Sequence, residues 1–219
     1  MPDSFTTLNL DPLKSVSLKN EPFPYMIIDD IIRPEARGEV VNSFPSLAKR
    51  GSFPLSSVTC KGSFATLIDE LQRPELREMI GARFGMDLQD RPPMITVRGY
   101  TTMRDGHIHV DSTSKLITLL LYLNPNWQSK QGCLRLLYNN HDLNTYAAEV
   151  PPEAGRCLIF KVTPNCWHGH EPFVGERRTI QLNYVTSDGV AERQIKRHRF
   201  SAFLKKFLLP KKDEAPSTR

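Results

Sequence analysis

The sequence predicts a mainly β fold of the α+β class, in which helices flank a core of antiparallel strands arranged as a sandwich or a barrel-like jelly roll. The 219 residues are enough for one sizeable domain, and a composition of 39% hydrophobic and 24% charged residues is ordinary for a globular protein. Helical periodicity is found before Pro93, whereas short apolar or alternating runs separated by turn residues follow it. The intervals between these runs are too short for helical crossovers, which favours antiparallel pairing.

The N-terminal part reads as a flexible segment followed by a strand and helices. Residues 1–22 carry three prolines and show no sustained period, so we expect a flexible lead-in. A β-prone run at 22–32 precedes a helical stretch at 34–44 that begins with a proline. Apolar residues recur at helical spacing over 67–80, and Pro74 divides them, which predicts a pair of helices that back the sheet.

The rest of the chain supplies the strands of the core. Six runs are apolar or alternating, namely 94–100, 107–110, 116–123, 134–138, 156–160 and 179–185. They place a jelly-roll core at about 94–186, within one domain that spans residues 23–190.

The C-terminal tail differs in charge from the rest of the chain. Eight Lys and Arg lie between Arg193 and Lys212 with no acid among them, and the remaining chain has 21 bases against 24 acids. The apolar residues between Phe200 and Leu208 recur at helical spacing, which predicts a basic amphipathic helix within 191–219. In one interpretation its apolar face packs on the domain. In the other, the helix contacts an anionic membrane, nucleic acid or an acidic partner.

Neither a targeting segment nor a membrane span is predicted. The N-terminus lacks a basic start and an apolar run, and the longest apolar run, 116–123, is too short for a transmembrane helix. We therefore expect a cytoplasmic protein. Its four cysteines have no CxxC spacing, so we interpret them as reduced thiols and not as a zinc site or a disulfide framework.

Three residues form a candidate metal site. His109 and Asp111 are two residues apart in a β-prone stretch, and alternation along a strand would point both side chains to one face. His168, in a loop between two predicted strands, is the natural third ligand. Two histidines and one carboxylate on one side of an octahedral ion leave three open positions, an arrangement that suits non-haem Fe(II).

Two adjacent arginines begin the last predicted strand. Arg178 lies ten residues after His168, and alternation would direct it to the same face as Ile180 and Leu182. A guanidinium at this point can bind the distal carboxylate of a dicarboxylic acid through paired, charge-assisted hydrogen bonds. Arg177 is a competing candidate, and a surface salt bridge is the alternative interpretation of Arg178.

The segments that contain these residues resemble the 2-oxoglutarate and Fe(II)-dependent dioxygenases of the prolyl-hydroxylase type. The resemblance covers about 94–185, and residues 22–32 are similar to the opening strand of many members. The matching segments are HVD at 109–111, TLLLYLNPNW at 118–127, QGCLRLL at 131–137, PPEAGRCLIF at 151–160 and WHGHEPFVGERRTIQLNY at 167–184. Their order and spacing together are more specific than any one segment.

The resemblance implies a double-stranded β-helix, or jelly roll, and a set of catalytic residues. It implies that His109, Asp111 and His168 bind Fe(II) and that Arg178 binds the C5 carboxylate of 2-oxoglutarate. The implied reaction consumes 2-oxoglutarate and O2, hydroxylates a substrate and releases succinate and CO2, with ascorbate as a candidate reductant.

Other residues are placed near the co-substrate by the same resemblance. A tyrosine at the position of Tyr122 commonly shares the C5 carboxylate in this family, and Thr118 and Tyr100 fall near other pocket positions. His107 and His170 each lie two residues from an expected ligand, and we interpret both as polar residues at the rim or behind the ligands.

The substrate is left open by the sequence. Because of the resemblance, hydroxylation of a prolyl or other residue of a protein is the leading hypothesis. A small molecule or a sugar is the alternative within the same chemistry, and a non-catalytic metal-binding jelly-roll module is the alternative from another class. We expect the loops at 46–62 and 139–149 to carry the specificity.

Overall fold

Two antiparallel β-sheets face each other, and helices cover the outer face of the larger sheet. The computed structural model describes residues 5–186. Its helices are α1 (Asp11–Ser15), α2 (Pro34–Asn42), the 3-10 helix η1 (Leu55–Ser57), α3 (Gly62–Leu71) and α4 (Pro74–Phe84). Its strands are β1 (Tyr25–Ile28), β2 (Phe53–Pro54), β3 (Pro93–Thr101), β4 (Lys115–Tyr122), β5 (Leu134–Leu137), β6 (Tyr146–Val150), β7 (Cys157–Lys161), β8 (His168–Gly169) and β9 (Gly175–Val185).

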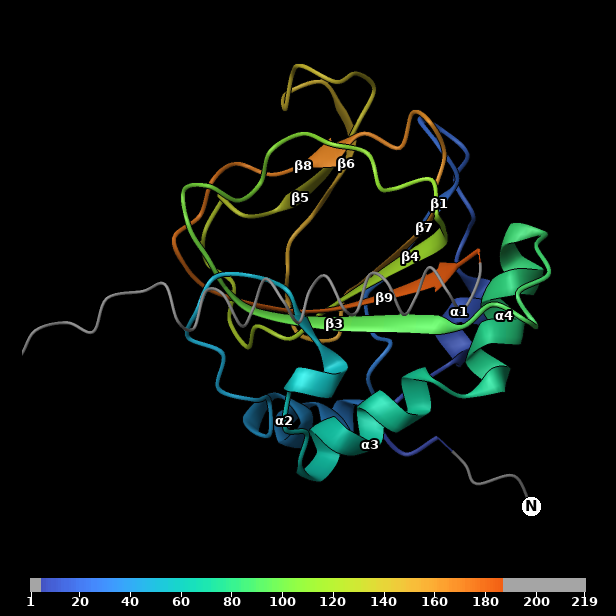
Figure 1. The fold of residues 1–219 in the computed structure, drawn as a ribbon, viewed down its shortest axis with the longest axis vertical. Helices are drawn as coiled ribbons and strands as arrows, with labels where there is room; N and C mark the ends of the chain where they lie inside the picture. The colour runs from blue at the N-terminus through green and yellow to red at the C-terminus, as the bar shows by residue number, and fades with distance from the viewer. Residues whose placement is uncertain (1–4, 187–219) are drawn as a thin grey trace, which may run out of the picture.

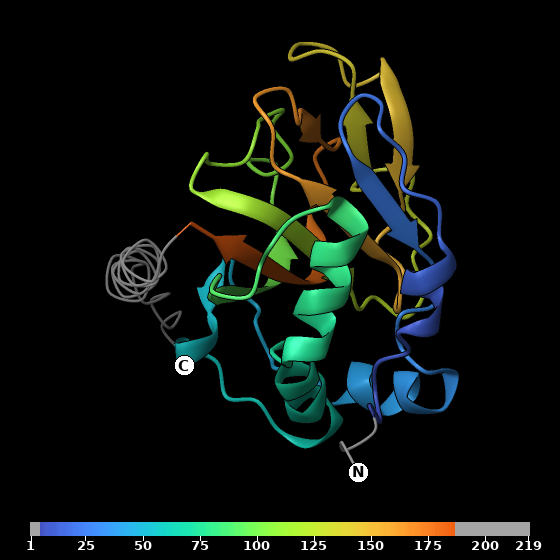
Figure 2. The ribbon, with the colours of Figure 1, turned by 90° about the vertical axis from the view of Figure 1, so that its right-hand side faces the viewer.

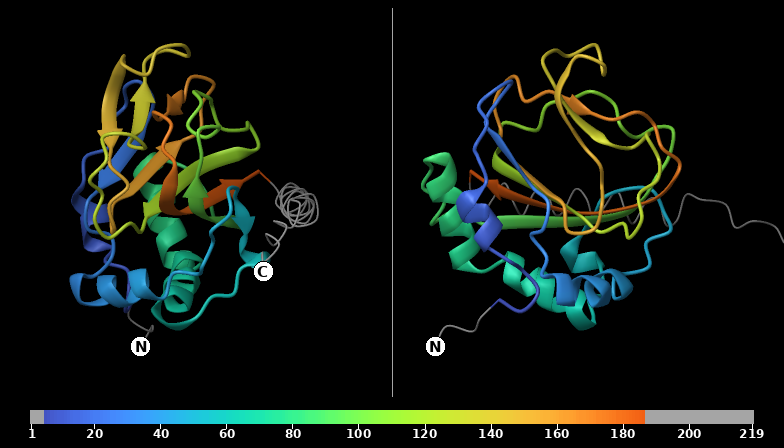
Figure 3. Two further views of the ribbon diagram at one scale, coloured as in Figure 1. Left: turned by 90° about the vertical axis from the view of Figure 1, so that its left-hand side faces the viewer. Right: turned by 180° about the vertical axis from the view of Figure 1, so that it is seen from behind.

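The strand order is β1-β7-β4-β9-β3-β2 in the larger sheet and β6-β5-β8 in the smaller one. Figure 1 shows the smaller sheet above the larger sheet and the helices below it, and Figure 3 shows the same layers from two further sides. In the register of the central strands, Leu119 on β4 lies opposite Leu182 on β9 and Ile159 on β7, so apolar side chains form rows across the sheet. The mainly β fold and its jelly-roll core are therefore confirmed.

The pair of helices expected over 67–80 is present as α3 and α4. Pro74 begins α4, and Gly85 ends it with a φ of 61°, in the left-handed region that favours glycine. Leu67 and Ile80 are among their buried residues and belong to the apolar cluster that includes Leu119 and Leu182. Figure 2 shows α4 in front of the strands. One face of the larger sheet is thus committed to packing on helices, which leaves its other face for the site.

The N-terminal segment differs from the flexible lead-in that the sequence predicted. From residue 5 onward it packs on the domain, and Leu8 and Leu13 are fully buried. The buried carboxylate of Glu70 on α3 accepts hydrogen bonds from the backbone N–H groups of Thr6 (2.5 Å), Thr7 (3.1 Å) and Leu8 (2.7 Å). Backbone hydrogen bonds of Thr7 and Asn9 with residues 31–33 also hold this segment. Contacts with residues so far along the chain have no signature in the local sequence pattern.

The strand expected at 107–110 is not formed. His109 makes only an isolated bridge with His168, and the segment between β3 and β4 is otherwise irregular. The strands β2, β6 and β8 were not predicted. The predicted helix within 191–219 lies outside the described residues. Among residues 5–186, no helix is both long and apolar enough to span a membrane.

Candidate active site

Three potential metal ligands meet between the two sheets. Ligand atoms of His109, Asp111 and His168 all lie within 4.8 Å of one another. His109 and Asp111 come from the segment between β3 and β4, whereas His168 begins β8. Reciprocal backbone hydrogen bonds of 3.0 Å join His109 to His168, and this bridge holds their imidazole centroids 4.3 Å apart. The structure thus brings together the three residues that the sequence singled out, although not on one strand.

Both imidazoles have the tautomer that a metal ligand needs. Nδ1 of His109 lies 2.8 Å from the carbonyl oxygen of His107, and Nδ1 of His168 lies 2.8 Å from the carbonyl oxygen of Cys166. Because a carbonyl oxygen can only accept, each Nδ1 carries the proton and each Nε2 presents a lone pair. Burial, together with the neighbouring His109, lowers the pKa of His168 to about 4, so this imidazole is neutral at neutral pH.

The carboxylate of Asp111 is held through both of its oxygens. Lys115 Nζ lies 2.8 Å from Oδ1, and the Thr118 hydroxyl lies 2.5 Å from Oδ2 and 2.9 Å from Asn183 Oδ1 on β9. Burial alone raises the pKa of Asp111, but Lys115, His168 and Thr118 outweigh it and keep this pKa below its usual value. The carboxylate is therefore ionised and oriented by the protein itself.

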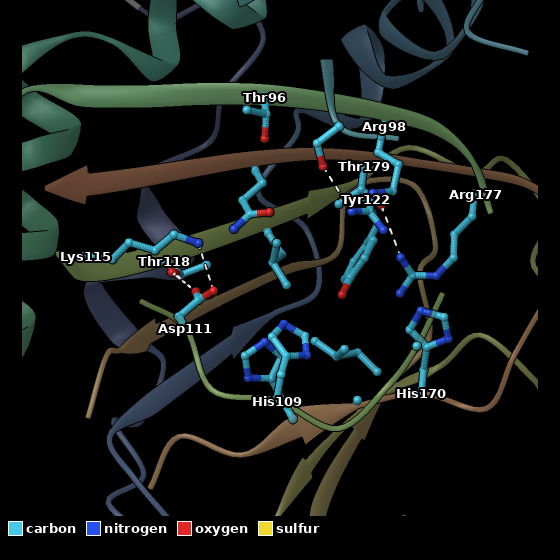
Figure 4. A pocket seen from close by; sticks show the side chains of 17 residues that line it. Thr96, Arg98, His109, Asp111, Lys115, Thr118, Tyr122, His170, Arg177 and Thr179 are labelled. Atoms are coloured by element: carbon cyan, nitrogen blue, oxygen red, sulfur yellow. Dashed lines mark hydrogen bonds and ion pairs between the residues drawn. The ribbon is translucent and has the colours of Figure 1, made fainter. Parts of the chain in front are cut away.

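A cavity of about 230 Å³ lies beside these three residues, and its walls combine polar and apolar surface in nearly equal parts. Side chains of β3, β4 and β9 line it, among them Thr96, Thr118, Tyr122, Thr179 and Gln181. Figure 4 shows Lys115 beside Asp111 at one end, and Arg98 and Arg177 together at the other end. The volume is below the roughly 300–1,000 Å³ of typical small-molecule pockets, so the enclosed space suits a small diacid.

The end of the cavity near Arg177 contains donors that lack an acceptor. Arg177 is 5% exposed, its Nε donates to the carbonyl of Gly132 at 2.9 Å, and its guanidinium lies 5.3 Å from the centroid of the Tyr122 ring. Within residues 5–186, Arg177 Nη2 and the Tyr122 hydroxyl are buried without a hydrogen-bond partner. Such a donor costs about 1–3 kcal/mol. The pair therefore marks a place for an acceptor from outside the chain.

The ionisation of Tyr122 suits a donor role. Burial raises the pKa of its phenol, and the nearby Arg177 only partly opposes this. The phenol therefore stays protonated at neutral pH and can donate to an anion beside Arg177.

Arg178 does not face the cavity, which corrects its expected role. Its Nη2 donates to Glu176 at 3.0 Å, its Nη1 donates to the carbonyl of Val41 on α2 at 3.3 Å, and its guanidinium lies 5.4 Å from the Phe44 ring centroid. Alternation does place Arg178 with Ile180 and the apolar residues that follow, but that face packs on the helices. The competing candidate, Arg177, is the one that lines the cavity.

Of the other pocket positions, Thr118 and Tyr122 line the cavity and Tyr100 does not. The register of β3 against β9 shifts between Arg98 and Tyr100, which interrupts the alternation there and leaves Arg98 on the cavity wall. A Cβ at Gly99, within the shift, would lie 2.5 Å from the backbone oxygen of Leu47, so only glycine fits at this bulge.

Four further positions complete the comparison with the sequence predictions. His170 lines the cavity, whereas His107 is exposed and contributes its carbonyl to His109. Lys115 and Arg98 were missed by sequence reasoning. The available signal for Lys115 was its position four residues after Asp111, and for Arg98 it was the alternation with Thr96 in β3.

Comparisons with known proteins agree with this fold. Residues 96–185 match the 2OG-Fe(II) oxygenase superfamily. Among solved structures, a prolyl hydroxylase from Trichoplax adhaerens in complex with a hypoxia inducible factor oxygen degradation domain peptide fragment has a TM-score of 0.51 at 19% identity, covering 78% of this chain and 86% of that one. A prolyl 4-hydroxylase from Phytophthora capsici has a TM-score of 0.53 at 15% identity, covering 92% and 72%.

One further structural match is shorter, and a sequence comparison found no match. A prolyl-4-hydroxylase from Pseudomonas putida has a TM-score of 0.46 at 20% identity, and the match covers 57% of this chain and 64% of that one. No curated protein matches the chain in sequence.

The fold is a jelly roll, and two histidines and one carboxylate converge between its two sheets. The match to the 2-oxoglutarate and Fe(II)-dependent oxygenase superfamily covers residues 96–185, less than half of the chain, and it indicates a hydroxylating dioxygenase. The cofactors of this superfamily are Fe(II), 2-oxoglutarate and O2. The residues fit these groups, since two Nε2 lone pairs and an ionised carboxylate converge beside a cavity whose far end holds unpaired donors.

Proposed function

We propose that His109, Asp111 and His168 hold Fe(II), and that Arg177, and not Arg178, binds the distal carboxylate of 2-oxoglutarate. The unpaired Arg177 Nη2 and Tyr122 hydroxyl, in the same cavity as the three ligands, carry this proposal. Fe(II), 2-oxoglutarate and O2 together insert one oxygen atom into a substrate C–H bond and yield succinate and CO2.

The side chains of this protein position the reactants. Arg177 offers a planar pair of donors to a carboxylate, and the Tyr122 phenol adds a neutral donor beside it. Lys115 and Thr118 fix the rotation of the Asp111 carboxylate, so that the same lone pairs always face the ion. Because the cavity is narrow and its donor end is buried, water is largely displaced once a diacid binds.

We propose a residue of a protein, such as proline, as the leading substrate, and a small molecule or a sugar as the alternative. The complex of the Trichoplax adhaerens enzyme with a peptide supports the first. The cavity of about 230 Å³ is compatible with both, because it admits one side chain of a polypeptide or one small molecule. We also keep the cytoplasmic location as a proposal, which the four free cysteines support.

The test is anaerobic addition of Fe(II) and 2-oxoglutarate, followed by a succinate assay in air. We expect the visible charge-transfer band of the chelate and slow succinate release even without added substrate. His109→Ala should abolish both signals. His141→Ala is the matched control, because His141 is an exposed histidine that does not line the cavity.

Two results would contradict the proposal. One is a wild-type protein that forms no band although it is folded by circular dichroism. The other is an equal loss of the band in both histidine variants. Once the band is established, peptides and metabolites incubated with the enzyme can be searched for a mass gain of one oxygen, which separates the two substrate classes.

A further inference from the structure

The cavity carries more positive charge than iron and 2-oxoglutarate would balance. Its walls hold Arg98, Lys115 and Arg177 against one carboxylate, that of Asp111. The two positive charges of Fe(II) and the two negative charges of 2-oxoglutarate cancel, so loading the site leaves the surplus in place. An uncompensated charge away from bulk water is costly, and the surplus is therefore a binding determinant for a further anion.

Apart from Arg177, which the proposed function assigns to 2-oxoglutarate, Arg98 is a cavity cation whose charge is balanced only in part. Its Nη1 lies 3.5 Å from Asp105 Oδ1, and its Nη2 donates to the hydroxyl of Ser52 at 3.0 Å. Asp105 has nearer partners, namely Arg50 Nε at 3.0 Å and the backbone N–H of Thr102 at 2.8 Å. Because Asp105 already shares its charge with Arg50, it neutralises Arg98 only in part.

The electrostatic environment of Arg98 agrees with this shortage of negative charge. Burial lowers the pKa of Arg98, Asp105 offsets part of that effect, and Arg177 and Arg50 lower the pKa further. Arg98 nevertheless keeps 34% of its side-chain surface accessible and lines the cavity, so a ligand can reach it.

2-Oxoglutarate does not need Arg98. A carboxylate offers about four lone-pair positions. At the proposed site, the two terminal nitrogens of Arg177 and the hydroxyls of Tyr122 and Thr179 supply a matching set of donors. Thr179 Oγ1 lies 3.5 Å from Arg177 Nη1 and lines the same cavity. Arg98 is therefore left for another group.

We propose that the primary substrate carries a carboxylate or phosphate group, and that Arg98, with Ser52 beside it, binds this group. The inference rests on the proposed function and adds the charge of the substrate to it. Because the cavity is small, the anionic group belongs to the part of the substrate that enters it. Arg98 is thus a specificity determinant, since a neutral substrate would leave its charge only partly balanced by Asp105.

The experiment uses the full chain loaded with Mn(II) and 2-oxoglutarate, a complex that does not turn over. Acetate, methyl phosphate and the neutral acetamide are titrated in turn, and the relaxation that Mn(II) induces in their methyl protons is measured. We expect saturable enhancement for at least one anion and none for acetamide. The anion that binds more tightly identifies the group as a carboxylate or a phosphate.

Three variants locate the binding residue. Arg98→Gln should lower the affinity of the loaded protein for the added anion about tenfold or more, as expected for the loss of a charge-assisted hydrogen bond. Arg98→Lys keeps the charge and should retain part of the affinity. Arg104→Gln is the matched control, because Arg104 is exposed and lies outside the cavity, and it should behave as wild type. Each variant is first shown to bind Mn(II) and 2-oxoglutarate.

The outcomes separate this inference from the proposed function. If Mn(II) and 2-oxoglutarate do not bind the wild-type protein, both proposals are wrong. If they bind and no second anion does, or if Arg98→Gln binds it as well as wild type, only the anionic substrate is ruled out. If Arg98→Gln lowered the affinity for 2-oxoglutarate as strongly as Arg177→Gln does, Arg98 would instead belong to the co-substrate site.

Discussion

The two faces of β9 show how one strand divides stability from chemistry. Arg177, Thr179 and Gln181 line the cavity, whereas Ile180, Leu182 and Tyr184 belong to the apolar cluster beneath the helices. Arg177 and Arg178 are adjacent and chemically identical, yet one is buried with an unpaired donor and the other reaches to Glu176 and the carbonyl of Val41. Residue type alone therefore does not define a ligand, because the face that the strand presents decides it.

The largest expected effect is on stability and comes from the core face. Leu182→Ala removes a fully buried side chain opposite Ile95 and Leu119, so we expect the free energy of unfolding to fall by about 3 kcal/mol. The affinity of the folded protein for 2-oxoglutarate should stay within a factor of two. Urea unfolding and 2-oxoglutarate titration measure the two quantities. A large loss of affinity in the folded variant would show that the faces are not independent.

The next effect is on co-substrate binding and comes from the cavity face. Arg177→Gln should lower the affinity for 2-oxoglutarate about 30-fold, or about 2 kcal/mol, because the buried carboxylate loses its charged donor. Arg178→Gln is the matched control, and we expect less than a threefold change, since its partners lie outside the cavity. The charge-transfer band with Fe(II) measures both. A stronger effect of Arg178→Gln would reverse the assignment.

The third effect is on the pH dependence of stability and comes from Glu70, on the helical side of the larger sheet. Burial alone raises the pKa of Glu70, but hydrogen bonds from Thr6, Thr7 and Leu8 outweigh it and hold this pKa below the ordinary 4.5. The ionised carboxylate therefore contributes stability above about pH 4.5, and this contribution is lost as pH falls toward the folded-state pKa.

Glu70→Gln tests this effect. The variant should lose about 2 kcal/mol at pH 7, because a buried acceptor for several N–H groups is replaced by a neutral amide. It should also show a shallower loss of stability than wild type below pH 4.5, as measured by thermal melting at several pH values. Parallel pH profiles of the two proteins would contradict the role of the carboxylate. Binding of 2-oxoglutarate at pH 7 should not change.

The smallest effect sharpens the description of the cavity face. Thr179→Val keeps the shape of the side chain and removes one hydroxyl, so we expect 2-oxoglutarate to bind about fivefold more weakly, or about 1 kcal/mol. Thr186→Val is the control, because Thr186 is exposed and does not line the cavity. Equal affinity of Thr179→Val and wild type would remove this hydroxyl from the proposed donor set.

Much of the fold could be predicted because local patterns carried it. Alternating or apolar runs marked β3, β4 and β9, and the proline that begins α4 marked the division between two helices. The predictions that failed concern short or irregular segments. The missed strand β8 has two residues, and the segment around His109, predicted as a strand, takes its shape from the bridge to His168 and not from its own propensity. Contacts between distant segments, such as those of Glu70, have no signature along the chain.

The sequence predicted the three residues that meet at the candidate metal site, and it predicted the proposed anion-binding end of the cavity only in part. The HxD pair alone is weak evidence, and His109, Asp111 and His168 could be identified because the order and spacing of the segments that contain them resemble those of a known family. Alternation along β9 correctly separated Arg177 from Arg178, but it does not say which face is the cavity. The polar residues Thr179 and Gln181 on the Arg177 face were the signal that would have decided the question, since a face that packs on helices is apolar.

The proposed metal ligands belong to different layers of the molecule. His168 lies in the smaller sheet, whereas Asp111 is fastened through Thr118 and Asn183 to the larger one. An ion bound to both would act as a cross-link between the two halves of the jelly roll, so its occupancy and the folding equilibrium are thermodynamically linked. Chelation should then do more than stop turnover: the metal-free chain would spend more time with its sheets parted, within reach of proteases.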